Sequence, residues 1–151
     1  MNFGKYNVSL NPIEELTSLG GIVIYILITL YFLLLKEFVV FKNLIFGFVF
    51  MYFVLIIVRG LYFKKRPNKQ KYNNFIEKID ASSFPSLHAA RALFIALIFK
   101  DFFNNIYVTI FSLLIVLGVA YSRLYLKRHY LSDIIGGFVL AIITYFLLAF
   151  I

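Results

Sequence analysis

Cysteine and tryptophan are absent from the 151 residues, and charged residues make up only 15% of them. Without cysteine the chain can form neither a disulfide bond nor a thiolate metal site. A soluble globular domain is usually about one quarter charged, so an ordinary water-soluble fold is not expected. Intrinsic disorder is also excluded, because too little of the chain is polar to keep it unfolded in water.

The residues that are present make the chain strongly apolar. Hydrophobic residues account for 62% of the sequence and aromatic residues for 20%, and the mean hydropathy is +0.90. A water-soluble monomer of this composition would expose apolar patches well above the few hundred Å², roughly, that such proteins tolerate. The composition therefore predicts an integral membrane protein. The length predicts one membrane-embedded domain over residues 1–151.

Hydrophobic runs predict an all-α, polytopic transmembrane helix bundle of about five spans. A helical span needs about 20 mostly apolar residues to cross the hydrocarbon core. The predicted spans cover residues 19–35, 44–63, 85–99, 106–126 and 131–151. A short interfacial helix is predicted before the first span, because Asn11 suits an N-cap and Pro12 suits the first helical position. Glu14 and Glu15 then fall in its first turn.

Small residues recur at helical spacing within two of the predicted spans. Ala92 and Ala96 are four positions apart in the third span, and Gly137 and Ala141 are four positions apart in the fifth. Such pairs allow helix backbones to approach each other closely in lipid. The alternative, that they are ordinary small residues of apolar helices, is equally good for either pair.

The net charge is +8, from 15 Lys and Arg residues against 7 Asp and Glu residues. In a membrane protein, a basic excess serves topology, anionic lipid head groups or anionic substrates. Nucleic-acid binding is not expected, because the basic residues lie in short loops between apolar runs. We therefore expect membrane lipids and an anionic substrate as partners.

Ionisable residues in or beside membrane spans are costly and by default suggest function. They gather here in three clusters, at residues 59–67, 84–88 and 122–133. The first cluster ends the second span, the second begins the third span, and the third joins the last two spans. An up-down bundle therefore places all three at one membrane face, where His88 and His129 meet three arginines.

The two histidines suit nucleophilic and acid–base chemistry. Imidazole titrates near neutral pH, so one ring can act as nucleophile and the other as general acid. His129 and Asp133 are four positions apart, which on a helix places them on the same face. The carboxylate can then hold one ring N–H and fix the tautomer, which leaves the other ring nitrogen free to attack an electrophile.

Groups that bind phosphate accompany the histidines. Arginine presents a planar fork of donors that suits a phosphate. Ser86 adds a hydroxyl, and the backbone N–H groups that open the third span point toward an anion. The pattern predicts attack by imidazole on a phosphorus atom held by Arg59, Arg66 and Arg123. No carboxylate cluster is available for a divalent metal, so a metal-free reaction without a cofactor is expected.

Each of these residues has a simpler explanation when it is taken alone. A histidine at a helix edge is usually interfacial, and an arginine near a span end usually extends toward the membrane surface. For the whole set this explanation is weak, because it must account for two histidines at one face with an acid one turn away. Arg91, which no motif requires, either reaches a second phosphate of a diphosphate substrate or, more simply, pairs with a carboxylate or extends to the surface.

The three clusters resemble the motifs of the type 2 phosphatidic acid phosphatase family, which includes the vanadium haloperoxidases. The family pattern is Lys-x6-Arg-Pro, then Pro-Ser-Gly-His, then Ser-Arg-x5-His-x3-Asp. The corresponding segments here are Arg59-x6-Arg66-Pro67, Pro85-Ser86-Leu87-His88 and Ser122-Arg123-x5-His129-x3-Asp133. The third motif is the most specific, and it matches at every position.

The resemblance implies a role for each matching residue. His129 would be the nucleophile that forms a phosphohistidine, Asp133 would orient it, and His88 would protonate the leaving group. The phosphate would be held by Arg59, Arg66, Ser86, the amide of Leu87 and Arg123. Water would then hydrolyse the phosphoenzyme without a metal. The implied activity is hydrolysis of a lipid phosphate or an isoprenoid diphosphate.

Two positions depart from the family pattern. Arg59 stands where the family has Lys, which keeps the charge on a bulkier group. Leu87 stands where the family has Gly, which removes backbone freedom. Pro-Ser-Leu-His is also similar to the inositol phosphorylceramide synthase branch, whose members pass a phosphoryl-bearing head group to an alcohol. A head-group transferase and a non-catalytic lipid-binding membrane protein therefore remain as alternatives.

Two criteria disagree about the membrane side of the predicted site. Basic residues on the site side are Lys5, Arg59, Lys64, Lys65, Arg66, Lys69, Lys71, Lys78, Arg123, Lys127 and Arg128, against Lys36, Lys42 and Lys100 on the other. The positive-inside rule places the larger group in the cytoplasm, whereas the resemblance implies the extracytoplasmic face of the cell membrane. We expect the extracytoplasmic face, because phosphate and lipid binding account for part of the excess.

Overall fold

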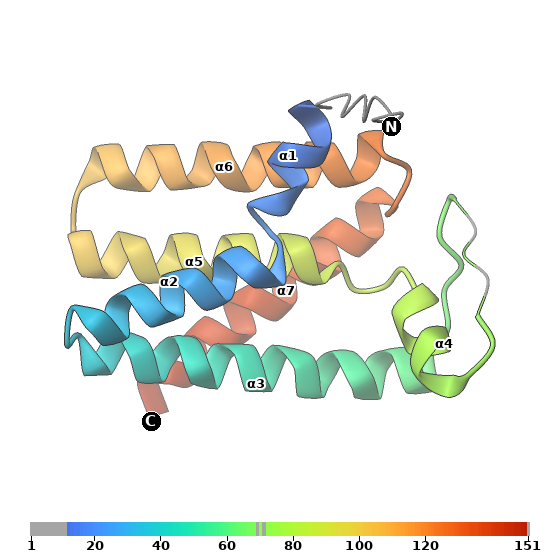
Figure 1. Cartoon of the computed structure of the whole chain (residues 1–151), viewed down its shortest axis with the longest axis horizontal. Helices are drawn as coiled ribbons and strands as arrows, with labels where there is room; N and C mark the ends of the chain where they lie inside the picture. Colours follow the sequence, from blue (N-terminus) through green and yellow to red (C-terminus); the bar gives the residue numbers. More distant parts are fainter. Residues whose placement is uncertain (1–11, 69, 71, 151) are drawn as a thin grey trace, which may run out of the picture.

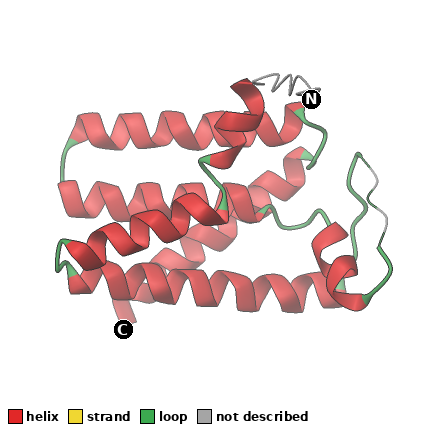
Figure 2. Cartoon of the chain, viewed as in Figure 1, coloured by secondary structure: helices red, strands yellow, loops and turns green. Residues whose placement is uncertain are grey.

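Helices account for all the regular secondary structure of residues 12–68, 70 and 72–150, which the computed structural model describes. The elements are α1 (Pro12–Ser18), α2 (Ile22–Leu34), α3 (Phe38–Leu61), α4 (Phe75–Ala81), α5 (Leu87–Phe103), α6 (Ile106–Tyr125), α7 (Leu131–Leu147) and the 3₁₀ turn η1 (Leu148–Phe150). Figures 1 and 2 show the long helices packed lengthwise with short connections. The predicted all-α class is confirmed.

The five predicted spans correspond to α2, α3, α5, α6 and α7, but they differ in length. Helices α3, α6 and α7 with η1 are each long and apolar enough to cross a membrane. Helix α2 reaches that length only together with α1, from which it is bent by 46°. Helix α5 has 17 residues, or about 26 Å of helix. The count of about five spans is therefore approximate.

The boundaries follow from a few backbone positions. Lys36 ends α2 with a φ of 61°, so α3 begins at Phe38 and already includes Lys42, which the sequence prediction left in a loop. At the other end of α5, Asn104 adopts a left-handed conformation and Asn105 accepts the N–H groups of Tyr107 and Val108. Two residues are therefore enough to reverse the chain between α5 and α6.

Helix α1 begins at Pro12, as the sequence predicts, while the proposed cap Asn11 lies outside the described residues. Helix α1 packs against α6, and Figure 1 shows it crossing that helix. The chain then turns at Gly20, where a Cβ atom would lie 2.8 Å from the backbone oxygen of His88. This close approach brings the α1–α2 connection onto the start of α5.

Helix α5 lies at the centre of the bundle. It contacts α2, α3, α6 and α7, and nine of its 17 residues are buried. The outer faces of the long helices expose aliphatic and aromatic side chains, such as Val49 on α3 and Leu117 on α6. An apolar outer surface is what a lipid environment requires, and it agrees with the predicted membrane protein.

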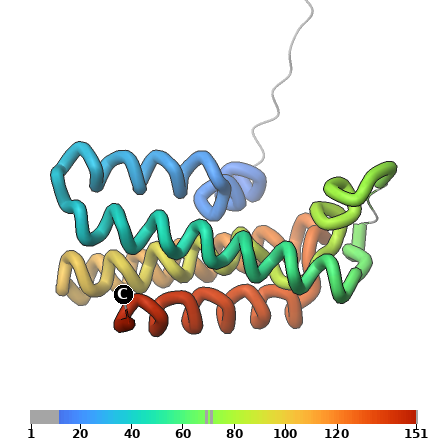
Figure 3. The backbone as a smooth tube through the Cα atoms, turned by 90° about the horizontal axis from the view of Figure 1, so that it is seen from below, coloured from blue at the N-terminus to red at the C-terminus, as the bar shows by residue number. Residues whose placement is uncertain are grey.

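One end of the bundle collects the polar segments. The C-terminal ends of α3 and α6, the N-terminal ends of α5 and α7, and all of α4 lie at the right of Figure 1, and Figure 3 shows the same grouping. Lys5, Lys69 and Lys71 lie outside the described residues. Helix α4 was not predicted, since the sequence there reads as a polar stretch. Asn74 caps α4 by accepting the N–H of Glu77 at 2.8 Å.

Candidate active site

A cavity of about 1070 Å³ occupies the polar end of the bundle. Its wall includes both histidines of the chain and all three arginines that the sequence places in the site. The ionisable and polar lining residues used below are Thr17, Tyr52, Arg59, Arg66, His88, Arg91, Arg123 and His129. The three sequence clusters, which are spread over residues 59–133, therefore meet at one cavity.

The arginines of this cavity lack carboxylate partners. The ion pairs within the described ranges are Lys64–Asp133 and Lys100–Asp101, and the one other cation-type side chain within 4 Å of a carboxylate there is His129. In the same part of the chain, the Nε atoms of Arg59, Arg66 and Arg123 are buried and have no hydrogen-bond partner. Buried cations are normally paired, because an isolated charge in a low-dielectric region is costly. This end of the protein is therefore suited to hold an anion.

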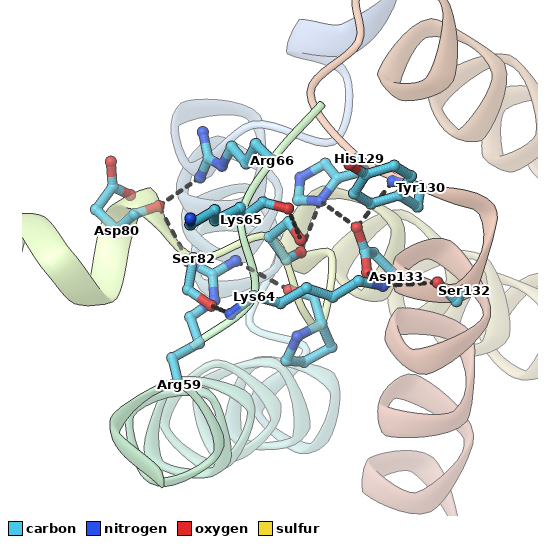
Figure 4. Close-up of polar contacts among 12 residues, drawn as sticks. Arg59, Lys64, Lys65, Arg66, Asp80, Ser82, His129, Tyr130, Ser132 and Asp133 are labelled. Atoms are coloured by element: carbon cyan, nitrogen blue, oxygen red, sulfur yellow. Dashed lines mark hydrogen bonds and ion pairs between the residues drawn. The ribbon is translucent and has the colours of Figure 1, made fainter. Parts of the chain in front are cut away.

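Arg59 connects three segments of the site. It is 5% exposed at the end of α3, and its Nη atoms donate to the carbonyls of Ile79 at 3.0 Å and Pro85 at 2.9 Å. Figure 4 shows its guanidinium reaching from α3 toward the loop before α5. Arg59 therefore anchors the segment that carries His88, while its buried Nε has no partner among the described residues.

Arg66 and Arg123 keep more of their donors free. Arg66 donates through Nη2 to the carbonyl of Asp80, which Figure 4 places at the end of α4. Arg123 donates through Nη1 to the hydroxyl of Thr17 at 3.3 Å, a long contact. That hydroxyl also accepts a hydrogen bond from Ser122 at 2.9 Å. Thr17 of α1 thus positions one of the arginines.

The imidazole of His129 is held differently from the sequence expectation. Its Nδ1 lies 2.7 Å from the carbonyl oxygen of Ser83, and 3.7 Å from Oδ2 of Asp133, which is too long for a hydrogen bond. His129 precedes α7 rather than lying on it, so the two side chains do not have the geometry of one helix face. A carbonyl only accepts, so Nδ1 carries the proton and Nε2 has the free lone pair.

Burial, followed by the positive charges of Arg123 and Arg66, lowers the pKa of His129 from its ordinary value of 6.5 to about 3. The ring is therefore neutral at neutral pH. A neutral imidazole with an unprotonated Nε2 is the form that acts as a nucleophile.

Asp133 instead ties the start of α7 to the neighbouring loops. Its side chain accepts from Nζ of Lys64 at 2.6 Å and from the N–H of Tyr130 at 2.8 Å, and its backbone oxygen accepts from the N–H of Ser86 at 2.9 Å. Figure 4 shows Lys64 reaching Asp133 beside His129. Asp133 therefore supports the site through the backbone on either side of it, and it does not line the cavity.

The first turn of α5 supplies the second histidine. His88 is half-buried in the cavity wall, and within the described part of the chain its ring has no hydrogen-bond partner. The hydroxyl of Ser86, just before it, is buried and likewise unpartnered there. Leu87 packs into the main apolar core and begins α5, so this position does not need glycine. Positive φ angles at non-glycine residues occur, among the described positions, only at Lys36, Asn104 and Lys127.

Sequence reasoning missed three contributors: Thr17, Lys64 and Ser83. Lys64 was counted only as one of many basic residues, and nothing in its neighbourhood distinguished it from Lys65. Ser83 contributes a backbone carbonyl, which every residue has, so no side-chain signal could have identified it. Thr17 lies outside all three motifs.

A search of the described residues finds no group of three or more His, Asp or Glu side chains that could hold a metal ion. The cavity lining has five arginines and two histidines against two carboxylates, Glu14 and Asp80, and this excess of cationic groups suits an anionic ligand rather than a cation.

An all-helical protein with membrane-length apolar helices, and with two histidines among unpaired arginines at one end, has the features of a membrane phosphatase. The family model of the PAP2 superfamily matches residues 44–150, over two thirds of the chain, and the protein belongs to this superfamily. The superfamily generally comprises phosphatases, which supports a phosphoryl hydrolase. No solved structure matches the chain. Helices α1 and α2 precede the matched segment.

Proposed function

We propose that the protein is an integral membrane lipid phosphatase that hydrolyses a lipid phosphate or an isoprenoid diphosphate through a phosphohistidine, without a metal. The observation that carries this proposal is the cavity in which two histidines face arginines that form no ion pair with any described carboxylate. A phosphate group would supply the missing negative charge.

The first step is attack by Nε2 of His129 on the phosphorus atom. An N–P bond forms and the P–O bond to the leaving group breaks. His88 donates a proton to the departing oxygen. Arg66 and Arg123 stabilise the negative charge that spreads over the phosphoryl oxygens. The Nε of Arg59 and the hydroxyl of Ser86 are buried and have no partner among the described residues.

The second step returns the histidine to its starting state. Water attacks the phosphorus atom, the N–P bond breaks, and orthophosphate leaves. His88, now neutral, accepts a proton from the attacking water, so it acts as base in the second step after acting as acid in the first. The Ser83 carbonyl holds the Nδ1 proton throughout, at 2.7 Å.

The apolar part of the cavity wall favours a lipid as the substrate. It includes Ile22 of α2 and Ile56 of α3, which are also 41% and 51% exposed on the outer surface of the bundle. Leu55 and Ile79 line the same wall. A hydrocarbon tail could therefore lie among apolar side chains while its phosphate meets the arginines.

Phosphate release from lipid phosphates by the protein purified in nanodiscs tests this proposal. Release should persist in EDTA, be blocked by vanadate, and be lost in His129→Ala while the variant keeps its helical circular dichroism. Lys100→Ala, at the opposite end of the bundle, should retain activity. Release that stops in EDTA, or that survives in His129→Ala, would contradict the mechanism.

Labelled lipid phosphate supplied with an excess of an alcohol acceptor separates hydrolysis from head-group transfer. The proposal expects the label in orthophosphate. Label that appears mainly in a new phosphodiester would instead identify a transferase that uses the same histidine.

A further inference from the structure

Arg91 is a buried cavity arginine that the proposed mechanism does not use. It lies in α5, one turn after His88, and is 3% exposed. Its Nε donates to the carbonyl of Gly20 at 3.0 Å, and its Nη1 donates to the hydroxyl of Tyr52 at 2.9 Å. Both simpler explanations therefore fail, because within the described ranges Arg91 meets no carboxylate and its side chain does not reach the surface.

The partners of Arg91 are neutral, so its charge is not compensated. Two neutral acceptors satisfy two donors, but they do not offset the cost of burying a full positive charge. A neutral donor such as glutamine could join the same three segments without that cost. A buried cation that faces a cavity and lacks a counterion is explained by an anion that binds there.

Arg91 lies close to the phosphate-binding group Arg123, because both hold the same turn of the chain. Arg123 binds the hydroxyl of Thr17, and Arg91 binds the carbonyl of Gly20. The N–H of Gly20 donates to the carbonyl of Thr17 at 3.2 Å, and such a turn keeps its first and fourth Cα atoms within about 7 Å. The two guanidinium groups are therefore neighbours in one cavity.

We propose that Arg91 forms a second anion subsite, which selects substrates that carry two adjacent phosphoryl groups. This inference rests on the proposed function. Nε2 of His129 attacks the terminal phosphorus, and the P–O bond to the bridging oxygen breaks. The bridging oxygen leaves with the lipid monophosphate, whose negative charge Arg91 binds. Water then releases the terminal group as orthophosphate.

A pair of prenyl substrates with the same tail, one a monophosphate and one a diphosphate, tests the subsite. In Arg91→Gln, kcat/KM for the diphosphate should fall at least about tenfold more than kcat/KM for the monophosphate. A tenfold difference corresponds to the loss of about one hydrogen bond to a charged group. Arg91→Lys, which keeps the cation, should retain most of the preference. Equal losses for both substrates in Arg91→Gln would show a structural role and overturn the inference.

Tyr52→Phe is the matched control for the structural contact. It removes the Nη1 partner and keeps the charge of Arg91, so the ratio of the two kcat/KM values should change little. A ratio that falls as far in Tyr52→Phe as in Arg91→Gln would assign the effect to positioning of α5 and overturn the subsite. Inorganic diphosphate, tested beside the prenyl diphosphate, tells whether a tail is required.

Binding of non-reacting probes separates this inference from the proposed function. The wild-type protein should bind methylenediphosphonate more tightly than orthophosphate, and Arg91→Gln should lose at least about tenfold of that preference. The difference in binding is expected even if the protein hydrolyses no lipid. In that case the proposed function fails, and the second anion subsite stands. Equal affinity of the wild-type protein for both probes would overturn the subsite, while lipid hydrolysis could still be intact.

Discussion

At the scale of single residues, the site depends on how each charged group is partnered. His129 is held by a backbone carbonyl, Asp133 is bound by Lys64 and a backbone N–H, and the cavity arginines form no ion pair with a carboxylate among the described residues. The histidine is therefore kept neutral with one defined tautomer, and the positive charge is left for a ligand. The contacts of these groups lead to three predictions.

The protonation state of His129 can be measured by ¹⁵N NMR of histidine-labelled protein in nanodiscs. Because burial and Arg123 lower its pKa to about 3, we expect the ring to stay neutral from pH 8 down to about 4. Nδ1 should show the shift of a protonated nitrogen and Nε2 that of an unprotonated one. His88→Ala assigns the signals, since the chain has 2 histidines. A ring that titrates near 6.5, or the opposite tautomer, would contradict the site geometry.

The lowered pKa of His129 also determines how the stability of the protein changes with pH. In the unfolded chain His129 takes up a proton below its ordinary pKa of 6.5, whereas in the folded protein it does so only near 3. Its contribution to stability is therefore present above pH 6.5 and lost as the pH falls toward 3.

Lys64→Ala should destabilise the protein, whereas the neighbouring Lys65→Ala should not. Lys64 binds Asp133 at 2.6 Å, and the Asp133 side chain is fully buried, so removal of the lysine leaves a buried carboxylate without its cation. We expect the free energy of unfolding to fall by about 1–3 kcal/mol. Thermal unfolding in the same detergent measures it. Equal melting temperatures for the two variants would mean that Lys64 does not hold Asp133.

The sequence predicted most of the residues that form the site, but it did not predict which groups hold them in place. The residue types and their spacing placed His88, His129 and the three arginines together, because an up-down bundle brings alternate connections to one end. The partner of His129 could not be predicted, since the Ser83 carbonyl has no sequence signature. Asp133 was predicted to bind the His129 ring because residues four apart lie on one face of a helix. Helix α7 begins only after His129, so that geometry does not apply.

At the scale of secondary-structure elements, the apolar runs predicted the long helices. Where polar residues lie within a helix, the predicted boundaries were wrong. The start of α6 at Ile106 and of α7 at Leu131 agrees with the prediction. Helix α3 begins six residues early, because polar side chains in its first turns were read as a loop. Helix α4 was missed because its seven residues are too few to show a periodicity.

Gly137→Ala tests the packing of α7 on the start of α5. A Cβ atom at Gly137 would lie 2.4 Å from the backbone oxygen of Ser86, so the helices must separate beside the motif that carries His88. We expect a loss of about 1–3 kcal/mol in the free energy of unfolding and a clear loss of activity. Phosphate release and thermal unfolding give the two readouts.

Gly60→Ala is the matched control, since a Cβ atom at this helical position would meet nothing within 4 Å. It should leave activity intact and stabilise α3 by up to about 1 kcal/mol. If Gly137→Ala behaves like Gly60→Ala, the close approach of α7 to Ser86 is not a constraint on the site.

At the scale of the whole molecule, the polar end and the apolar sides divide the surface into two regions. Nine basic residues of the described chain lie at the cavity end of the bundle, and three lie at the opposite end. They are Arg59, Lys64, Lys65, Arg66, Lys78, Arg91, Arg123, Lys127 and Arg128, against Lys36, Lys42 and Lys100. The arginines among them serve an anion site, so part of the asymmetry reflects ligand binding rather than topology.

The side of the membrane follows from labelling of single cysteines, since the chain has none of its own. Asn73 is exposed at the cavity end, next to the cap of α4, and Lys100 is exposed at the other end. We expect a membrane-impermeant thiol reagent added to intact cells to label Asn73→Cys and not Lys100→Cys. The reverse pattern would place the cavity in the cytoplasm, as the positive-inside rule predicts.

The central claim is that His129 carries the phosphoryl group, and trapping the phosphoenzyme tests it most directly. Protein mixed with ³²P-labelled substrate and quenched in alkali within milliseconds should hold label that is stable in base and released by acid, as a phosphoramidate is. Peptide mapping should place the label on His129. In His88→Ala, any label that forms should still be found on His129. Label on another residue, or turnover without any labelled protein, would contradict the account.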